Sequence, residues 1–176
     1  MDDLHEYLED LDSKPCISIV GDPRLSSFRE KGFNRKQRKS ARQQVAYLLK
    51  LVKPGKAYIF PNKGVNSMSI RLLDAMGFPV TIVNPYLGYC DKLGILDKLN
   101  LSQASKKYNV ITVVGDTPTT LREEMEYLRE TLLFIAERSQ VVIYVHGKDR
   151  SPELKDRLDT IMSVGGGMVV CVNYDT

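Results

Sequence analysis

Four short segments of the sequence pair a glycine with side chains that can bind an anion. They are residues 21–24 (GDPR), 62–67 (NKGVNS), 115–120 (GDTPTT) and 147–151 (GKDRS). Glycine lets the backbone approach a ligand closely, and Lys, Arg, Ser and Thr side chains donate hydrogen bonds to phosphate oxygens. Loops after strands are rich in such residues for structural reasons too, which is the alternative for any single segment. Together the segments predict a phosphate-bearing ligand near Gly21, Arg24, Lys63, Gly64, Asn66, Ser67, Gly115, Thr117 and Ser151.

The segment from residue 23 to residue 42 carries eight basic residues and one acid, with Phe28 and Phe33 among the charges. Cations that neutralise phosphates and rings that stack on bases are typical of proteins that bind single-stranded nucleic acid. A run of charges is also common on a plainly solvated face. The nucleic-acid-binding candidates are Arg29, Lys31, Arg35, Lys36, Arg38, Lys39 and Arg42.

These candidates need elements that bring them together. Short apolar runs alternate with amphipathic stretches, which indicates βαβ units and a mainly parallel sheet. We expect about six strands, at residues 16–20, 56–60, 80–83, 109–114, 141–145 and 168–172. The predicted fold class is α/β, a single Rossmann-like domain with three α/β/α layers. In such a sheet ligands bind beyond the carboxyl ends of the strands, where the glycine segments lie.

The sequence also predicts several local features. Thr117 is expected to cap the helix after the fourth strand, and Asn84-Pro85 to end the third strand. Strands that read as nearly unbroken apolar runs are usually buried on both faces, so we expect all six to be buried. The three cysteines are expected to fill the core.

Composition limits the class of protein. The 176 residues are 43% hydrophobic and 27% charged, which suits one globular domain. No apolar run approaches the roughly 18 residues of a membrane span, and the chain lacks the start of a signal peptide, so we expect a cytoplasmic protein without a membrane partner. The cysteines and histidines lack metal-ligand spacing, and neither GxxxxGK[ST] nor GxGxxG occurs. No metal site and no cofactor are therefore expected, and a P-loop NTPase or a dinucleotide dehydrogenase is disfavoured.

The first fourteen residues carry six acids against Lys14. We expect residues 1–14 to form an acidic helical segment appended to a Rossmann-like domain at residues 15–176. This segment is one candidate to cover the basic segment, either within the chain or between subunits of a homo-oligomer.

Four places in the chain carry a family resemblance. Residues 21–24 are similar to a G-S-R turn, residues 64–66 with Ser69 to a G-[IV]-D-x-x-A helix start, residues 127–130 (YLRE) to Y-L-x-R-N, and residues 150–154 (RSPEL) to R-S-G-[ST]-L. These motifs resemble the SLOG superfamily of Rossmann-like domains, which includes DprA-like DNA-processing proteins and LOG-type hydrolases. Asn66, Glu130 and Pro152 replace an acid, an asparagine and a glycine of the family pattern.

The resemblance implies a nucleotide, a nucleotide-derived ligand or nucleic acid as the partner. It places this ligand near Gly21, Arg24, Gly64, Asn66, Arg129 and Ser151, although Arg129 would also suit a solvated helix face. The first hypothesis is therefore a Rossmann-like module that binds a nucleotide or single-stranded nucleic acid without turning it over.

Two alternatives stay open, so the sequence does not decide whether the chain is an enzyme. Asp149 and Glu153 resemble the acid-rich segment of nucleoside deoxyribosyltransferases, in which one carboxylate attacks the anomeric carbon and a second assists. Glu153 would then be the nucleophile of an enzyme acting on an N-glycosidic bond, although Glu153 also simply complements the start of a helix. The other alternative is a non-catalytic regulatory or structural protein whose ancestral pocket has eroded.

Overall fold

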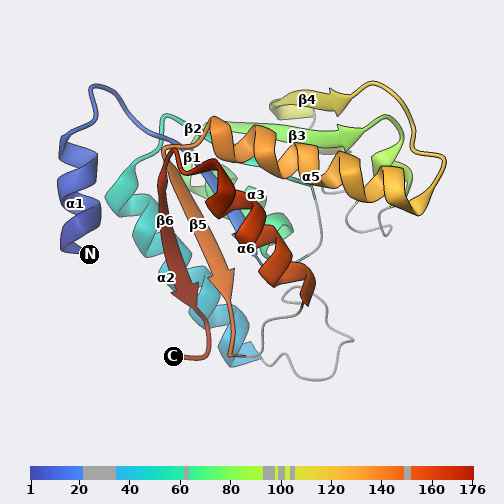
Figure 1. The fold of residues 1–176 in the computed structure, drawn as a ribbon. Helices are drawn as coiled ribbons and strands as arrows, with labels where there is room; N and C mark the ends of the chain where they lie inside the picture. The colour runs from blue at the N-terminus through green and yellow to red at the C-terminus, as the bar shows by residue number, and fades with distance from the viewer. Residues whose placement is uncertain (22–34, 62–63, 93–97, 99–101, 104–105, 149–151) are drawn as a thin grey trace.

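Six strands form one parallel sheet in the computed structural model of the chain (Figure 1). The structure describes residues 1–21, 35–61, 64–92, 98, 102–103, 106–148 and 152–176. Every neighbouring pair in the sheet is parallel, in the order β4-β3-β2-β1-β5-β6. The predicted α/β class with a parallel six-stranded sheet is confirmed. The strands are β1 (Cys16–Gly21), β2 (Lys56–Ile59), β3 (Val80–Tyr86), β4 (Asn109–Val114), β5 (Val141–His146) and β6 (Met168–Asn173).

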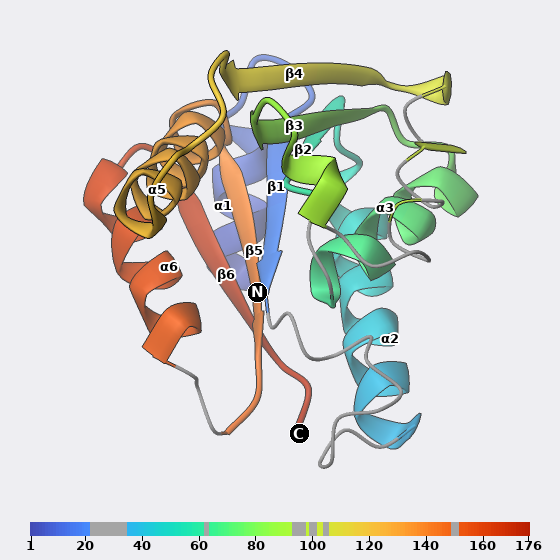
Figure 2. The ribbon, with the colours of Figure 1, turned by 90° about the vertical axis from the view of Figure 1, so that its right-hand side faces the viewer.

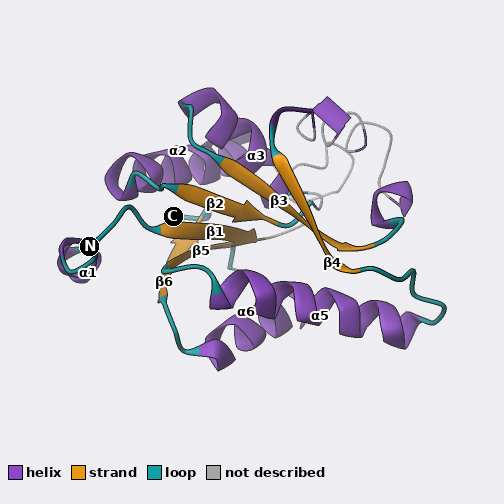
Figure 3. Cartoon of the chain, turned by 90° about the horizontal axis from the view of Figure 1, so that it is seen from above, coloured by secondary structure: helices purple, strands orange, loops and turns teal. Residues whose placement is uncertain are grey.

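Helices cover both faces of the sheet, which makes the predicted three layers (Figures 2 and 3). Helices α2 (Arg35–Val52) and α3 (Val65–Met76) lie on one face, and α5 (Leu121–Glu137) and α6 (Pro152–Val164) lie on the other. The short helix η1 (Tyr89–Lys92) follows β3, and α1 (Asp2–Glu9) lies beside α2 (Figure 1). No helix among the described residues is both long and apolar enough to cross a membrane.

The core lies between β1, β2, β5 and the helices on each face. Ile17, Ile59 and Ile143 are fully buried in the sheet, and Leu49 is fully buried on α2. Apolar residues recur on α2 at 41, 45, 48, 49 and 52, which is the spacing of a helix with one buried face. Leu4 of α1 joins the same cluster and is 3% exposed, so α1 packs on the domain.

Two strands are not buried on both faces, contrary to the prediction. β4 and β6 are the two edges of the sheet, and a strand at an edge has a neighbour on one side only. Most residues of β4 are exposed, and β6 is partly exposed. Cys171 of β6 is exposed for the same reason, and Cys16 and Cys90 are only half-buried, so the cysteines do not fill the core.

Two local predictions are wrong as well. Thr120, not Thr117, caps α5, and its hydroxyl accepts a hydrogen bond from the Glu123 N–H at 3.1 Å. The sequence T-x-x-E at 120–123 is the capping-box signature, which outweighs the proline two residues earlier. β3 continues past Asn84-Pro85 to Tyr86, because β4 still pairs with it there.

Candidate nucleic-acid interface

The direction of the connections reverses between β1 and β5. β1 is followed along the chain by α2 on one face, whereas β5 is followed by α6 on the other face (Figure 3). The two strands are neighbours, with Gly21 opposite Val145 at their carboxyl ends. Ligands of parallel α/β sheets bind at such a switch point, in the crevice outside the carboxyl ends. The described residues around Gly21 and Gly147 therefore form the rim where a ligand is expected.

Glycine is required at three positions of this rim by close packing or backbone conformation. A Cβ on Gly21 would lie 2.8 Å from the Val145 carbonyl oxygen and from Val65, and a Cβ on Gly147 would lie 2.6 Å from the ring of Tyr174. Gly64 has φ 78° and ψ −129°, a conformation that residues with a side chain rarely adopt. These glycines explain how β1, β5 and the start of α3 come so close together.

Asn66 presents an unused acceptor at the start of α3. The side chain is 1% exposed, and its Nδ2 donates to the Phe60 carbonyl oxygen at 2.9 Å. This bond fixes the amide orientation, because a flipped amide would place two acceptors against each other. Its Oδ1 has no hydrogen-bond partner among the described residues. A buried unpaired acceptor is costly, so a ligand donor at this point would be favourable.

Arg157 places a positive charge beneath the tip of β1. It lies on the core-facing side of α6, is 8% exposed, and donates from Nη1 to the Gly21 carbonyl oxygen at 3.5 Å. Burial raises the pKa of the neighbouring Tyr89 hydroxyl well above its usual value, and the Arg157 charge opposes part of that rise. The sequence analysis missed Arg157, although its spacing with the buried Leu154 and Ile161 marks it as a cation on an apolar helix face.

Asp175 ties the beginning of α2 to this rim. Its carboxylate accepts hydrogen bonds from the Lys148 N–H and from Gln37 Nε2, both at 2.7 Å. These two bonds, the Lys148 N–H first, lower the pKa of Asp175. Gln44 of α2 also donates to the Asn173 carbonyl oxygen at 3.0 Å. The basic end of α2 is thereby held at the carboxyl end of β6, where Figure 1 shows it beside the strand arrowheads.

The solvent face of α2 carries cations and one exposed tyrosine. We call this face the cationic stripe; its exposed members are Lys36, Lys39, Gln43, Tyr47 and Lys50. They are three or four residues apart and so lie along one side of the helix. Tyr47 is 60% exposed, and α2 contains no acid. The predicted Arg35 and Arg42 are exposed beside the stripe, and Arg38 is half-buried.

The stripe continues at its far end into a hollow of about 730 Å³. Lys14 and Lys53 add two cations there, beside Phe78. Neither Tyr47 nor this lysine group was a candidate from the sequence. The regular spacing of 36, 39, 43, 47 and 50 on a helix was the signal that could have identified Tyr47.

Comparison with known proteins identifies the fold. No protein-family model matches this sequence, and no curated protein matches it with significance. The structure is similar to the X-ray structure of DNA processing protein A (DprA) from Streptococcus pneumoniae, with a TM-score of 0.51 and 12% sequence identity. The match covers 94% of this chain and 60% of that chain. The chain has a DprA-like Rossmann-type fold. The resemblance to SLOG domains is thus confirmed as a likeness of fold.

The DprA-like fold brings some of the predicted site residues together and separates others. Gly21, Gly64, Asn66 and Ser67 lie at the ends of β1 and at the start of α3, on adjacent elements. Gly115 and Thr117 follow β4, which is separated from β1 by two strands and hence by about 14 Å. Arg129 is exposed in the middle of α5, on the face opposite α2.

The structure does not place the side chains of the remaining candidates. Glu153 belongs to α6, but the position of its side chain is not described. The candidates that lie outside the described residues are Arg24, Arg29, Lys31, Lys63, Asp149 and Ser151. Within the described residues, no cluster of His, Cys, Asp and Glu has the arrangement of a metal site.

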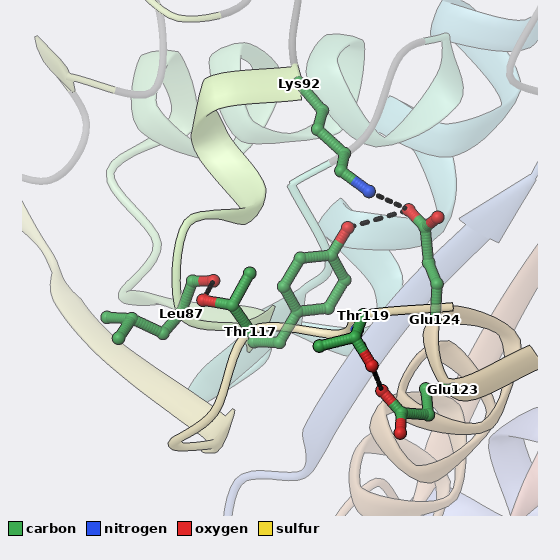
Figure 4. A network of polar contacts seen from close by, with 7 residues as sticks. Leu87, Lys92, Thr117, Thr119, Glu123 and Glu124 are labelled. Atoms are coloured by element: carbon green, nitrogen blue, oxygen red, sulfur yellow. Dashed lines mark hydrogen bonds and ion pairs between the residues drawn. The ribbon is translucent and has the colours of Figure 1, made fainter. Parts of the chain in front are cut away.

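A second polar network lies at the carboxyl ends of β3 and β4 (Figure 4). The buried Tyr86 hydroxyl donates to Glu124 Oε1 at 2.7 Å, and Lys92 Nζ forms an ion pair with the same oxygen at 3.0 Å. Thr117 does not face the switch point, because its hydroxyl donates to the Leu87 carbonyl oxygen at 2.9 Å. The network fastens α5 and η1 to the ends of the strands.

We expect Glu124→Gln to reduce stability at neutral pH and to have no effect in acid. The Tyr86 hydrogen bond, followed by that of Lys92, lowers the pKa of Glu124 below its ordinary 4.5. A carboxylate with a lowered pKa stabilises the fold above pH 4.5, and this contribution is lost as the pH falls through the folded-state value. Urea unfolding should show a loss of about 1 kcal/mol at pH 7 that is smaller at about pH 3 and vanishes in stronger acid. An equal loss at both pH values, or an equal effect of the exposed control Glu130→Gln, would contradict this assignment.

Proposed function

We propose that this chain binds single-stranded nucleic acid along α2, with phosphates on the cationic stripe and a base stacked on Tyr47. The observation that carries the proposal is the composition of this face: exposed lysines flank an exposed tyrosine, and α2 contains no acid. Phosphate neutralisation by cations together with stacking on an aromatic ring is the usual way in which proteins bind a single strand.

The position of the cations on α2 argues against a merely solvated face. Five of the first eight residues of α2 are basic, and its first turn contains no acid. The positive end of the helix dipole disfavours cations there, by about 0.3–1 kcal/mol each at exposed sites. Repulsion among neighbouring cations adds to this cost. A bound polyanion would offset both the dipole cost and the repulsion. On a face that contacts only water, glutamates in the first turn would be more stabilising than these cations.

The rim at the switch point would hold one phosphate or sugar of the same strand. Arg157 supplies a positive charge beneath β1, and the unpaired Oδ1 of Asn66 can accept a hydrogen bond from a ribose hydroxyl or a base amine. α2 begins at this rim and extends away from it for about 27 Å. A strand of several nucleotides can therefore follow α2 from the rim to the lysine hollow. The similar solved structure is that of DNA processing protein A.

The two other hypotheses from the sequence receive no added support. An enzyme acting on an N-glycosidic bond needs a placed pair of carboxylates, and the side chains of Asp149 and Glu153 are outside what the structure describes. A regulatory protein with an eroded pocket would have no use for an acid-free cationic face. Release of free base from a nucleoside, abolished by Glu153→Gln, would favour the enzyme.

The direct test is binding of a fluorescent oligonucleotide, followed by anisotropy at several salt concentrations. With four or five phosphate contacts, the logarithm of the binding constant should fall with the logarithm of salt concentration with a slope of roughly −3. Tyr47→Ala should weaken binding by about 1–3 kcal/mol, that is, about fivefold to 150-fold, whereas Tyr47→Phe keeps the ring and should bind like the unchanged chain. Binding that does not depend on salt, or that tolerates Tyr47→Ala, would refute the proposal.

A further inference from the structure

β4 is an open sheet edge that lacks the usual protection against pairing. Its sequence, NVITVV, contains no charge and no proline. Val110 is 45% exposed and Ile111 is 36% exposed, and Figures 1 and 2 show none of the described helices beyond the outer side of β4. Natural edge strands commonly carry lysines, prolines or bulges that prevent another strand from pairing. β4 therefore presents a surface suited to accept one more strand.

The backbone groups that face outward follow from the pairing of β4 with β3. The Leu87 N–H donates to the Val114 carbonyl oxygen at 3.3 Å, so the peptide groups of Val114 face β3. This direction does not extend back along β4, because the pairing of the two strands skips Pro85 and Val113. The Ala57 N–H donates to the Pro79 carbonyl oxygen, so residues 81 and 83 of β3 face β2, and residues 82 and 84 face β4 and bond to residues 109, 111 and 113. The N–H and C=O groups of Val110 and Thr112 therefore face away from the sheet.

We propose that two copies of this chain pair through β4 in antiparallel orientation, with Ile111 opposite Ile111. In an antiparallel pair, two residues exchange hydrogen bonds only if both face the partner. The register centred on Ile111 satisfies this condition, since it places Val110 of each copy opposite Thr112 of the other, with Ile111 opposite Ile111 as the non-hydrogen-bonded pair between them. The result is one continuous twelve-stranded sheet with a two-fold axis perpendicular to it, a closed and self-complementary arrangement.

Charges at the two ends of β4 favour this same register. With Ile111 opposite Ile111, the beginning of β4 in each copy lies beside its end in the other. Lys106, just before β4, thus comes near Asp116, just after it, which gives two pairs of opposite charge. Both residues are exposed. Lys107, by contrast, is already paired with Asp74 of its own chain, at 2.6 Å. Charge complementarity thus selects a second copy of the chain as the occupant of the edge.

The helix behind β4 adds apolar surface on one side of the axis. Rotation about an axis perpendicular to the sheet leaves both α5 helices on the same face. α5 packs on β3 and β4, and it exposes Leu121 and Met125, which are four residues apart on its first turns. Pairing of β4 alone buries little area, so apolar side chains beside the axis would strengthen the dimer.

The test is the mass of the full chain in solution, measured by light scattering and sedimentation at about 1 to 100 µM. The unchanged 19.9 kDa chain should form a dimer. Ile111→Lys should be monomeric with an unchanged circular dichroism spectrum, because the lysine is added at an exposed position. Met162→Lys, which replaces an exposed apolar residue on α6, should remain dimeric.

Two further variants test the register. Lys106→Asp should weaken dimerisation at least tenfold, and adding Asp116→Lys in the same chain should restore it. In a Cys171→Ser background, Ile111→Cys should form a disulfide-linked dimer under mild oxidation, because facing residues of a non-hydrogen-bonded pair lie about 4.5 Å apart at Cα. Three results would overturn the proposal. They are a chain that is still monomeric at about 100 µM, a dimer that is insensitive to Ile111→Lys, and a dimer that appears only with another protein bound.

Discussion

Replacing Arg35, Lys36, Lys39 and Arg42 together with glutamine should lower the affinity for a single-stranded oligonucleotide on the order of a thousandfold at about 50 mM salt. Each lost phosphate contact removes about 0.7 from the salt slope of single-strand binding, which corresponds to nearly tenfold in affinity at that salt concentration. The slope should therefore become shallower by roughly three. All four side chains are exposed, so the fold should be unaffected.

A matched pair of variants separates position from net charge. Lys36→Gln with Lys39→Gln and Arg122→Gln with Lys155→Gln each remove two exposed cations from a chain of net charge +3. The first pair lies on the cationic stripe, and the second lies on the helices of the opposite face. The first should cost about a hundredfold and the second less than about twofold at the same salt concentration. Equal losses would mean that binding follows only the overall charge, and the interface on α2 would have to be abandoned.

The acidic N-terminal segment does not neutralise this face in the described part of the chain. α1 is fixed to the core by Leu4, and none of the ion pairs described joins an acid of α1 to a cation of α2. The exposed cations of the cationic stripe, Lys36, Lys39 and Lys50, are therefore open to solvent and to a ligand. α1 lies beside α2 in Figure 1, so its acids also restrict the path that a negatively charged strand can follow.

The sequence predicted the strands well because local pattern determines them, but it did not predict their burial. β4 (NVITVV) and β5 (VVIYVH) are almost equally apolar, yet β5 is buried throughout and β4 is mostly exposed. The difference comes from their places in the sheet, at an edge and in the middle. Strand order depends on which crossover each helix makes, and no local pattern in the sequence contains that information.

The candidate site was predictable to a similar extent. Glycines at the ends of β1 and β5 were recognised from their place in the sequence, and the topology made them neighbours. Gly115 and Arg129 were grouped with them, although one follows the edge strand and the other lies on the opposite face. Arg157 was overlooked because a charged residue within a helix is normally assigned to the solvent side. Its burial against the end of β1 appears only when α6 is folded onto the sheet.

Gly21→Ala should destabilise the chain by about 1–3 kcal/mol and displace the rim at the switch point. The added Cβ would lie 2.8 Å from the Val145 carbonyl oxygen, which belongs to the backbone of the adjacent central strand and cannot turn aside. Relief requires β1 and β5 to separate or α3 to move with Val65. Either change also shifts the Gly21 carbonyl that Arg157 contacts.

Gly115→Ala is the matched control, because it makes the same substitution at the end of a strand where a Cβ meets no atom within 4 Å. Its φ is not positive, so alanine should leave stability unchanged or raise it by about 0.4–1 kcal/mol through the unfolded state. Urea unfolding gives both free energies, and oligonucleotide anisotropy on the same samples gives the affinities. If Gly115 also contacts a phosphate through its backbone, Gly115→Ala will lose affinity without losing stability. If Gly21→Ala is as stable as the unchanged chain, the close packing of β1, β5 and α3 is wrong, and the rim that depends on it does not exist in this form.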